Sequence, residues 1–362
     1  MTRTLSRSFA SAALWVALAA SSAVAADAPV FVYVSVAGEN RIAVMKQDAE
    51  TGRLTHQSDG KIESGPGSLA LSPNKSRLYA AARGTKSVVS LAVDQKTGAL
   101  KTLGTTPVFD NPVYVTTDRT GRWLLAASYS AGKFAIYPID ANGVVGAKAS
   151  QLVEAEKNAH AIRIDAANEF VYVPNCGADS LLVYRFNPEN GTVAPAKTPR
   201  VATAQRSGPR HLAFHPTQPW IYVVNEHDST ASAFKFDRAT ETLSPINTLS
   251  TLPKSFEGKN TCADAEVSPD GKTFYGSNRG RDSIAIYAID PQTGALTARG
   301  DAATGKTPRE FGLDPAGKFL YSAGQGDGSL TSHKIAADGS LEKLTVEQIG
   351  PDPCWVLATT LE

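Results

Sequence analysis

The stretch Ser268–Leu296, SPDGKTFYGSNRGRDSIAIYAIDPQTGAL, contains the pattern that decides the fold. A Ser-Pro-Asp-Gly step precedes an apolar segment around Tyr275, the alternating segment Ser283–Ile289 follows, and a Gly-containing turn leads to Leu296. Proline presets φ, while Asp and Gly supply the backbone conformations that tight hairpins need. Alternating side chains are typical of a half-buried strand. The stretch therefore predicts short β-strands joined by hairpins.

Units of this kind recur along the whole chain, each with an anchor residue in its second apolar segment. The steps between anchors are 46, 46, 47, 50, 53 and 46 residues. Such a period, with short strands and no helical periodicity, is typical of a β-propeller with four-stranded blades. We therefore predict an all-β, seven-bladed propeller. The anchors are Tyr33, Tyr79, Leu125, Tyr172, Tyr222, Tyr275 and Tyr321.

The two ends of the chain complement each other. The first unit begins with its second strand, Val30–Val36, and lacks a first strand of its own. The C-terminal segment Pro353–Ala358 has the character of an innermost strand. We expect the two to pair in the first blade and close the ring, because a propeller cannot leave a sheet edge open there.

Residues 1–25 have the pattern of a signal peptide. Arg3 and Arg7 precede the apolar run Phe9–Ala20, and the small-residue sequence Ala23-Val24-Ala25 follows. The run is short for a membrane span, so we favour cleavage over a membrane anchor. The expected mature chain, residues 26–362, is one propeller domain in the periplasm or the medium.

The net charge and the cysteine content limit the classes of partner and ligand that the chain is expected to bind. Removing the two arginines of residues 1–25 leaves 34 basic and 35 acidic residues, and the near-zero balance predicts neither a nucleic-acid partner nor a membrane surface. A monomer is the expected state. The three cysteines, Cys176, Cys262 and Cys354, leave at least one thiol unpaired within the chain, and a disulfide between two of them is possible. Their spacing does not suggest zinc.

Polar residues gather in one column of the repeat. The residue that begins the first strand and the residue that ends the second lie on the same rim, 16 positions apart. Paired carboxylates or arginines at strand ends often have a structural role, which we assign to Arg83 and Glu310. At these equivalent positions the residue type nevertheless differs from unit to unit, although the rest of the repeat is regular. This variation indicates a functional site. The pairs are Gly67 and Arg83, Val113 and Tyr129, His160 and Cys176, Arg210 and Glu226, Ala263 and Arg279, and Arg309 and Gln325, with Tyr114, His211, Asp264 and Glu310 beside them.

The motifs in this column resemble a known family. They are similar to those of the seven-bladed lactonases that include the propeller-type 6-phosphogluconolactonases, and to the fungal enzyme that lactonises carboxy-muconate. The resemblance covers the expected mature chain and implies four catalytic residues, His160, Arg210, Glu226 and Arg279. The motifs are Asn158–Ala161, Gly208-Pro209-Arg210-His211, Val224-Asn225-Glu226, Ser277–Gly280, Thr307-Pro308-Arg309 and Ala323-Gly324-Gln325.

Opening a sugar aldonolactone needs a base for water, stabilisation of the oxyanion and protonation of the ring oxygen. We expect Glu226 or His160 to be the base, and Arg210 and Arg279 to stabilise the carbonyl oxygen or bind a negative group of the substrate. The chain would then be a carboxylic-ester hydrolase. Expected substrate contacts are His211, Asp264, Arg309 and Gln325.

No cofactor or metal is expected. His211 and His215 are four positions apart, so at about 3.3 Å per residue a strand separates them too far to share an ion. No Gly-x-Ser-x-Gly elbow indicates a serine hydrolase. Export favours gluconolactone over 6-phosphogluconolactone. A lactone-forming cycloisomerase and a non-catalytic propeller that binds a protein or cell-wall ligand remain alternatives.

Overall fold

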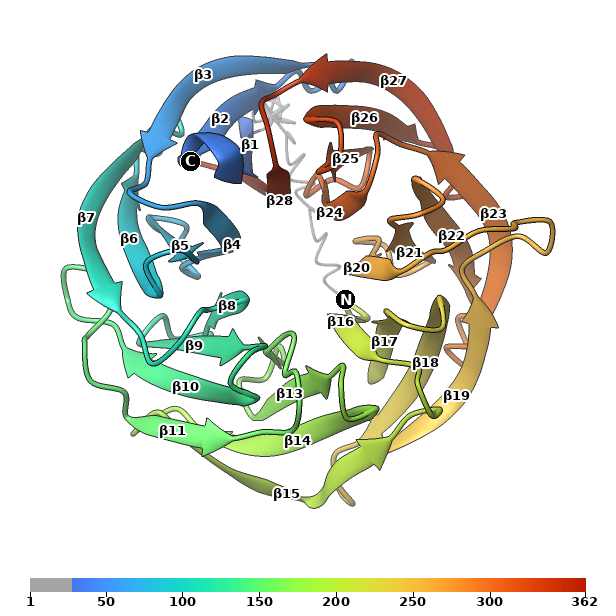
Figure 1. Cartoon of the computed structure of the whole chain (residues 1–362), viewed down its shortest axis with the longest axis horizontal. Helices are drawn as coiled ribbons and strands as arrows, with labels where there is room; N and C mark the ends of the chain where they lie inside the picture. Colours follow the sequence, from blue (N-terminus) through green and yellow to red (C-terminus); the bar gives the residue numbers. More distant parts are fainter. Residues whose placement is uncertain (1–27) are drawn as a thin grey trace, which may run out of the picture.

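The computed structural model describes residues 28–362, which form seven four-stranded antiparallel sheets arranged as the blades of a ring (Figure 1). In each blade the first strand lies nearest the centre and the fourth lies at the outer edge. The predicted seven-bladed propeller is therefore confirmed. The predicted signal peptide, residues 1–25, lies outside the described residues.

The strands follow the repeat. Blade one contains β28 (Pro353–Thr360), β1 (Val30–Val36), β2 (Arg41–Gln47) and β3 (Leu54–Lys61). Blade two contains β4 (Pro66–Leu71), β5 (Arg77–Ala82), β6 (Ser87–Val93) and β7 (Leu100–Pro107). Blade three contains β8 (Tyr114–Thr117), β9 (Trp123–Ser128), β10 (Lys133–Pro138) and β11 (Gln151–Glu154). Blade four contains β12 (Arg163–Ile164), β13 (Phe170–Asn175), β14 (Ser180–Asn187) and β15 (Thr192–Ala202).

The last three blades keep the same order. Blade five contains β16 (Pro209–Phe214), β17 (Trp220–Asn225), β18 (Thr230–Asp237) and β19 (Thr242–Ser250). Blade six contains β20 (Cys262–Val267), β21 (Thr273–Asn278), β22 (Ser283–Ile289) and β23 (Leu296–Ala303). Blade seven contains β24 (Pro308–Leu313), β25 (Phe319–Gly324), β26 (Ser329–Ile335) and β27 (Leu341–Gln348). A 3-10 turn, η1 (Ala37–Glu39), follows β1.

The ring closes as predicted. The C-terminal strand β28 pairs antiparallel with β1, with Tyr33 opposite Leu357 and Val34 opposite Val356. β28 extends two residues beyond the predicted end, to Thr360, because the pairing with β1 continues to Val30. Blade one thus draws strands from both ends of the chain.

The anchor residues of the repeat join neighbouring blades. Each anchor tyrosine lies buried in the second strand of its blade, and five of the six donate a hydroxyl hydrogen bond to a glycine carbonyl in the turn between the third and fourth strands of the next blade. The last contact links blade seven to blade one and closes the ring. The bonds are Tyr33 to Gly98, Tyr79 to Gly143, Tyr222 to Gly294, Tyr275 to Gly339 and Tyr321 to Gly52.

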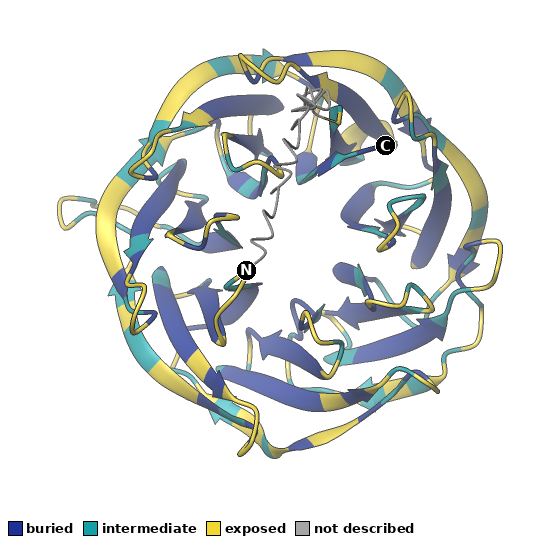
Figure 2. Cartoon of the chain, turned by 180° about the vertical axis from the view of Figure 1, so that it is seen from behind, coloured by how far each residue is buried: buried dark blue, intermediate teal, exposed yellow. Residues whose placement is uncertain are grey.

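Burial follows the same radial order. The inner strands of the blades are largely buried, whereas the outer strands are largely exposed (Figure 2). The core lies between adjacent blades, since clusters of apolar side chains combine residues of two blades, as Tyr33 and Leu78 do. Among the described residues no helix is long and apolar enough to cross a membrane.

Candidate active site

Bulges in the innermost strands position Arg210 and Arg309, the first residues of two predicted pairs. In the pairing of β16 with β17, Pro209 lies opposite Asn225 and His211 opposite Val224, so Arg210 is the extra residue. Arg309 has the same place in β24. A bulge re-aims the side chain of its extra residue, which is why bulges occur beside functional sites. We call the edge of the ring where the innermost strands begin the first rim.

The turn before β16 brings the chain close to the end of β17. Gly208 has φ of +67°, and a Cβ there would lie 2.5 Å from the ring of His227. Its carbonyl accepts a 2.6 Å hydrogen bond from the amide of Glu226. The Gly-Pro-Arg-His motif therefore needs its glycine, which sets Arg210 beside Glu226.

Arg210, Glu226 and Arg279 form an ion cluster on the first rim. Glu226 Oε2 lies 3.4 Å from Arg210 Nε, and Glu226 Oε1 accepts a 2.6 Å hydrogen bond from Arg279 Nη2. Arg210 is fully buried and donates a hydrogen bond to the carbonyl of Ala263. Its Nε and Nη2 find no hydrogen-bond partner among the described residues. Those N–H groups are therefore buried without a hydrogen-bond acceptor in residues 28–362, although Nε lies within ion-pair range of Glu226.

The cluster shifts the pKa values of its members. Burial alone would raise the pKa of Glu226, but the charges of Arg210 and Arg279 outweigh burial and hold that pKa below its ordinary value. Burial, with the like charges of Arg309 and Arg279, lowers the pKa of Arg210 to about 10. Glu226 is therefore ionised at neutral pH, and its charge is engaged by two guanidinium groups.

His160 lies beside this cluster as a neutral imidazole. It is 5% exposed, and its Nδ1 has no hydrogen-bond partner among the described residues. Burial and the charge of Arg210 hold its pKa well below the usual value. The ring packs edge-on against Tyr129 and His211 at centroid distances of 5.3 and 5.2 Å. A neutral imidazole with a free nitrogen is suited to accept a proton.

A second set of titratable groups lies one residue further along the innermost strands. His211 Nδ1 lies 3.0 Å from Asp264 Oδ1 and 3.5 Å from Glu310 Oε1. Burial raises the pKa of Asp264, and burial together with the charge of Asp264 raises that of Glu310 well above its usual value. The Asp264 and Glu310 carboxyl groups therefore favour the protonated form more than isolated carboxyl groups do.

His211, Asp264 and Glu310 also form a possible metal-ligand set, because one ligand atom from each lies within 4.8 Å of the others. The guanidinium of Arg210 lies 3.7 Å from Glu310 Oε1, and its charge opposes a further cation at that carboxylate. The expectation of a metal-free site stays a prediction.

The predicted residues meet at a narrow crevice. His160, Arg210, His211 and Arg309 line it together with Glu310, in a volume of about 10 Å³. Glu226 and Arg279 reach this crevice through their contacts with Arg210, and Asp264 reaches it through His211 and Glu310. The structure thus brings seven of the eight predicted site residues into one network.

Gln325 lies apart from that network. It lines a neighbouring cavity of about 360 Å³ with Arg83 and Asn111, and it donates a 2.6 Å hydrogen bond to Asp352 Oδ1. Arg83 and Cys354 line both the cavity and the crevice. The cavity and the crevice are therefore adjacent.

The cysteines are all buried free thiols, so the possible disulfide is not formed. The Sγ atom of Cys176 lies 3.5 Å from Glu226 Oε2 and 3.4 Å from His227 Nε2. Burial, and then the charge of Glu226, raises the pKa of the Cys176 thiol. The thiol therefore stays protonated and donates to the Glu226 carboxylate.

One residue of the site was expected to have a structural role, and another was not predicted at all. Glu310, expected to be structural, lines the crevice, and burial with the charge of Asp264 raises its pKa. Trp355 also lines it, and the signal for it was available, since it follows Cys354 in the closing strand as His211 follows Arg210. Tyr129, a member of the column, contacts His160.

Comparison with known proteins gives the family. The family model for the lactonase, 7-bladed beta-propeller, matches residues 31–358. The 6-phosphogluconolactonase of Pectobacterium carotovorum is 31% identical over 332 residues, which cover 91% of this chain and 99% of that protein. The 6-phosphogluconolactonase of Erwinia tasmaniensis is 32% identical over 295 residues, 81% of this chain and 88% of that protein.

A solved structure has the same fold. The periplasmic gluconolactonase of Pseudomonas aeruginosa superposes with a TM-score of 0.84 at 24% identity, covering 92% of this chain and all of that one (100%). The match of the family model over nearly the whole described region, with relatives above 30% identity, agrees with the motifs of the first rim. The chain therefore belongs to the lactonase family of seven-bladed β-propellers.

Proposed function

We propose that this protein hydrolyses the ring ester of a sugar aldonolactone at the first-rim crevice by general acid–base catalysis. The observation that carries the proposal is a neutral histidine, His160, beside a buried arginine with unpartnered N–H groups, Arg210. Membership of a lactonase family and the names of the curated relatives support a lactone as the substrate.

His160 acts as the base and accepts a proton from the attacking water. The water oxygen bonds to the lactone carbonyl carbon, and the carbonyl oxygen becomes an oxyanion. Arg210 and Arg309 bind the oxyanion, since both line the crevice and charged N–H donors stabilise such an oxygen strongly in a dry site. His160 is favoured over Glu226 because the Glu226 carboxylate is already bound by Arg279 and Arg210.

Glu310 acts as the acid. Its pKa is raised by burial and by Asp264, so it carries a proton at neutral pH in the crevice. When the carbonyl to ring-oxygen bond breaks, that proton passes to the ring oxygen and a hydroxy acid leaves. A base with a lowered pKa and an acid with a raised pKa in one crevice are the pairing that such catalysis requires.

The remaining residues position the reactants. Glu226 holds Arg210 and Arg279, and His211 connects to the acid through Asp264. The sugar hydroxyls bind in the cavity that contains Gln325 and Arg83, next to the crevice. No step needs a metal, and the protein acts as a monomer.

The substrate is a gluconolactone, phosphorylated or not. The curated relatives are named 6-phosphogluconolactonase, and a structural neighbour is named periplasmic gluconolactonase. If residues 1–25 direct export to the periplasm, glucono-1,5-lactone from the oxidation of glucose outside the cytoplasm is the expected substrate.

The test is hydrolysis of fresh glucono-1,5-lactone and of its 6-phosphate by the purified mature protein with EDTA, corrected for spontaneous opening. Turnover of either lactone that resists EDTA, and is lost in Arg210→Ala and Glu226→Ala, supports the proposal. The rate with the better lactone identifies the substrate. No acceleration of either lactone over buffer would refute it.

A further inference from the structure

A second cavity occupies the other end of the ring, away from the catalytic crevice. Its volume is about 450 Å³, and it is lined by the innermost strands β4, β8, β12, β20, β24 and β28. This volume lies within the usual range of small-molecule sites, about 300–1,000 Å³. Glu310 and Trp355 line both spaces, so this layer separates the second cavity from the crevice.

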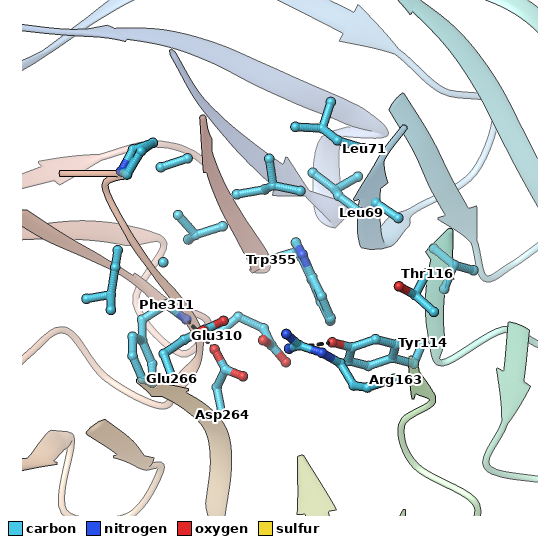
Figure 3. Close-up of a pocket in the computed structure, with 18 of the residues that line it drawn as sticks. Leu69, Leu71, Tyr114, Thr116, Arg163, Asp264, Glu266, Glu310, Phe311 and Trp355 are labelled. Carbon is cyan, nitrogen blue, oxygen red and sulfur yellow. Dashed lines mark hydrogen bonds between the residues drawn. The ribbon is translucent and has the colours of Figure 1, made fainter. Parts of the chain in front are cut away.

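Two charged side chains, Arg163 and Glu266, project into this cavity (Figure 3); their charges act on each other, but they form no close ion pair among the residues that the structure describes. Arg163 donates a 3.2 Å hydrogen bond to Tyr114 Oη and forms no ion pair within the described chain. Glu266, on β20, has neither a side-chain hydrogen bond nor an ion pair to any residue in the range 28–362. A guanidinium has five N–H donors, so most of the capacity of Arg163 remains unused.

The neighbouring arginine is already occupied. Arg119 lines the same cavity, but its Nε donates to the carbonyl of Asp165 and its Nη2 to that of Ile164. The cavity therefore offers one available guanidinium, not two. A single arginine fork fits one carboxylate, whereas a doubly charged phosphate usually recruits several cations.

One side of the cavity wall is apolar and aromatic. Leu69, Leu71 and Trp355 line the side of the cavity near Tyr114 (Figure 3), and the rings of Tyr114 and Trp355 pack edge-to-face at 5.2 Å. Such a wall accepts the carbon chain of a ligand. The polar groups at Arg163 and Glu266 fix its orientation.

We propose that this cavity is a second ligand site, which binds a small hydroxylated carboxylate. The ligand carboxylate binds Arg163 and Tyr114, a hydroxyl donates to Glu266, and the carbon chain lies against Trp355. The hydroxy acid that a lactonase releases belongs to this class. The polar contacts, Arg163, Tyr114 and Glu266, lie outside the crevice, so the inference stands without the proposed lactonase activity.

The test is isothermal titration of the whole mature protein with sodium D-gluconate as the probe. Arg163→Met should weaken binding about tenfold or more, because a charged hydrogen-bond donor is lost. Glu154→Gln, at an exposed position outside both sites, is the control and should bind gluconate as the wild type does.

Several results would overturn the proposal. They are no binding of gluconate at millimolar concentration, and equal binding of sorbitol, which lacks the carboxylate. Thermal melts check that each variant folds. If Arg163→Met does not fold, Arg163→Lys is used instead. It keeps the positive charge but lacks the planar guanidinium that binds a carboxylate through two N–H groups, so it should still weaken binding severalfold. Unchanged affinity in the folded Arg163 variant also contradicts the site.

Discussion

Neutralising Glu226 should destabilise the protein, because that carboxylate compensates buried arginine charge. Its oxygens lie 2.6 Å from Arg279 Nη2 and 3.4 Å from Arg210 Nε. Two unit charges at 4 Å attract by about 4 kcal/mol in a partly shielded protein environment. Desolvation offsets part of this, although the side chain keeps 17% of its exposure and so part of its hydration. We expect Glu226→Gln to lower the free energy of unfolding by about 2 kcal/mol.

Urea denaturation at two pH values measures this contribution. The pKa of Glu226 is lowered in the folded state, so its stabilisation is present above the unfolded pKa, about 4.3, and is lost as the pH falls through the folded value. The difference between wild type and Glu226→Gln should therefore shrink in acid. Glu154→Gln is the control, since Glu154 pairs with Lys133 at 74% exposure and should change stability little. Equal stability of Glu226→Gln and wild type at neutral pH would refute the reasoning.

Three further predictions concern the scaffold and the thiols. Gly98→Ala should lower the free energy of unfolding by about 2–4 kcal/mol, because φ is +69° and the new Cβ would lie 2.5 Å from the ring of Phe31; a urea titration with wild-type stability would contradict this. Tyr222→Phe should cost about 1 kcal/mol by leaving the Gly294 carbonyl unpaired, while Tyr184→Phe, whose hydroxyl bonds to no described residue, should be nearly neutral in the same assay. The three buried thiols should not react with a thiol reagent in the native protein, and all three should react in denaturant; fewer than three would indicate a disulfide.

The sequence was sufficient for the fold because the repeat has a structural cause. Tyr33, Tyr79 and their equivalents recur since each hydroxyl reaches a turn glycine of the next blade. Strand Ser283–Ile289 was predicted with its observed limits. The predicted ring closure is confirmed, and only the end of β28 was set too early, because propensity alone does not show how far two strands stay paired.

The site was less completely predictable. The column on the first rim identified residues that meet in space, because the pleat fixes which strand ends share a rim. It did not show that bulges re-aim Arg210 and Arg309, since a bulge depends on pairing with the neighbouring strand. The raised pKa of Glu310 was not predicted either, because burial and the approach of Asp264 in the folded chain cause that shift in pKa. The second cavity arises from residues that lie outside the column, such as Arg163.

The central claim is that lactone hydrolysis depends on the neutral imidazole of His160. The most direct measurement is kcat/KM for glucono-1,5-lactone and its 6-phosphate with wild type and His160→Gln, beside thermal melts of both proteins. We predict a loss of about 100-fold or more in His160→Gln for the better substrate, the usual contribution of a general base. A folded His160→Gln variant with wild-type kcat/KM would contradict the account.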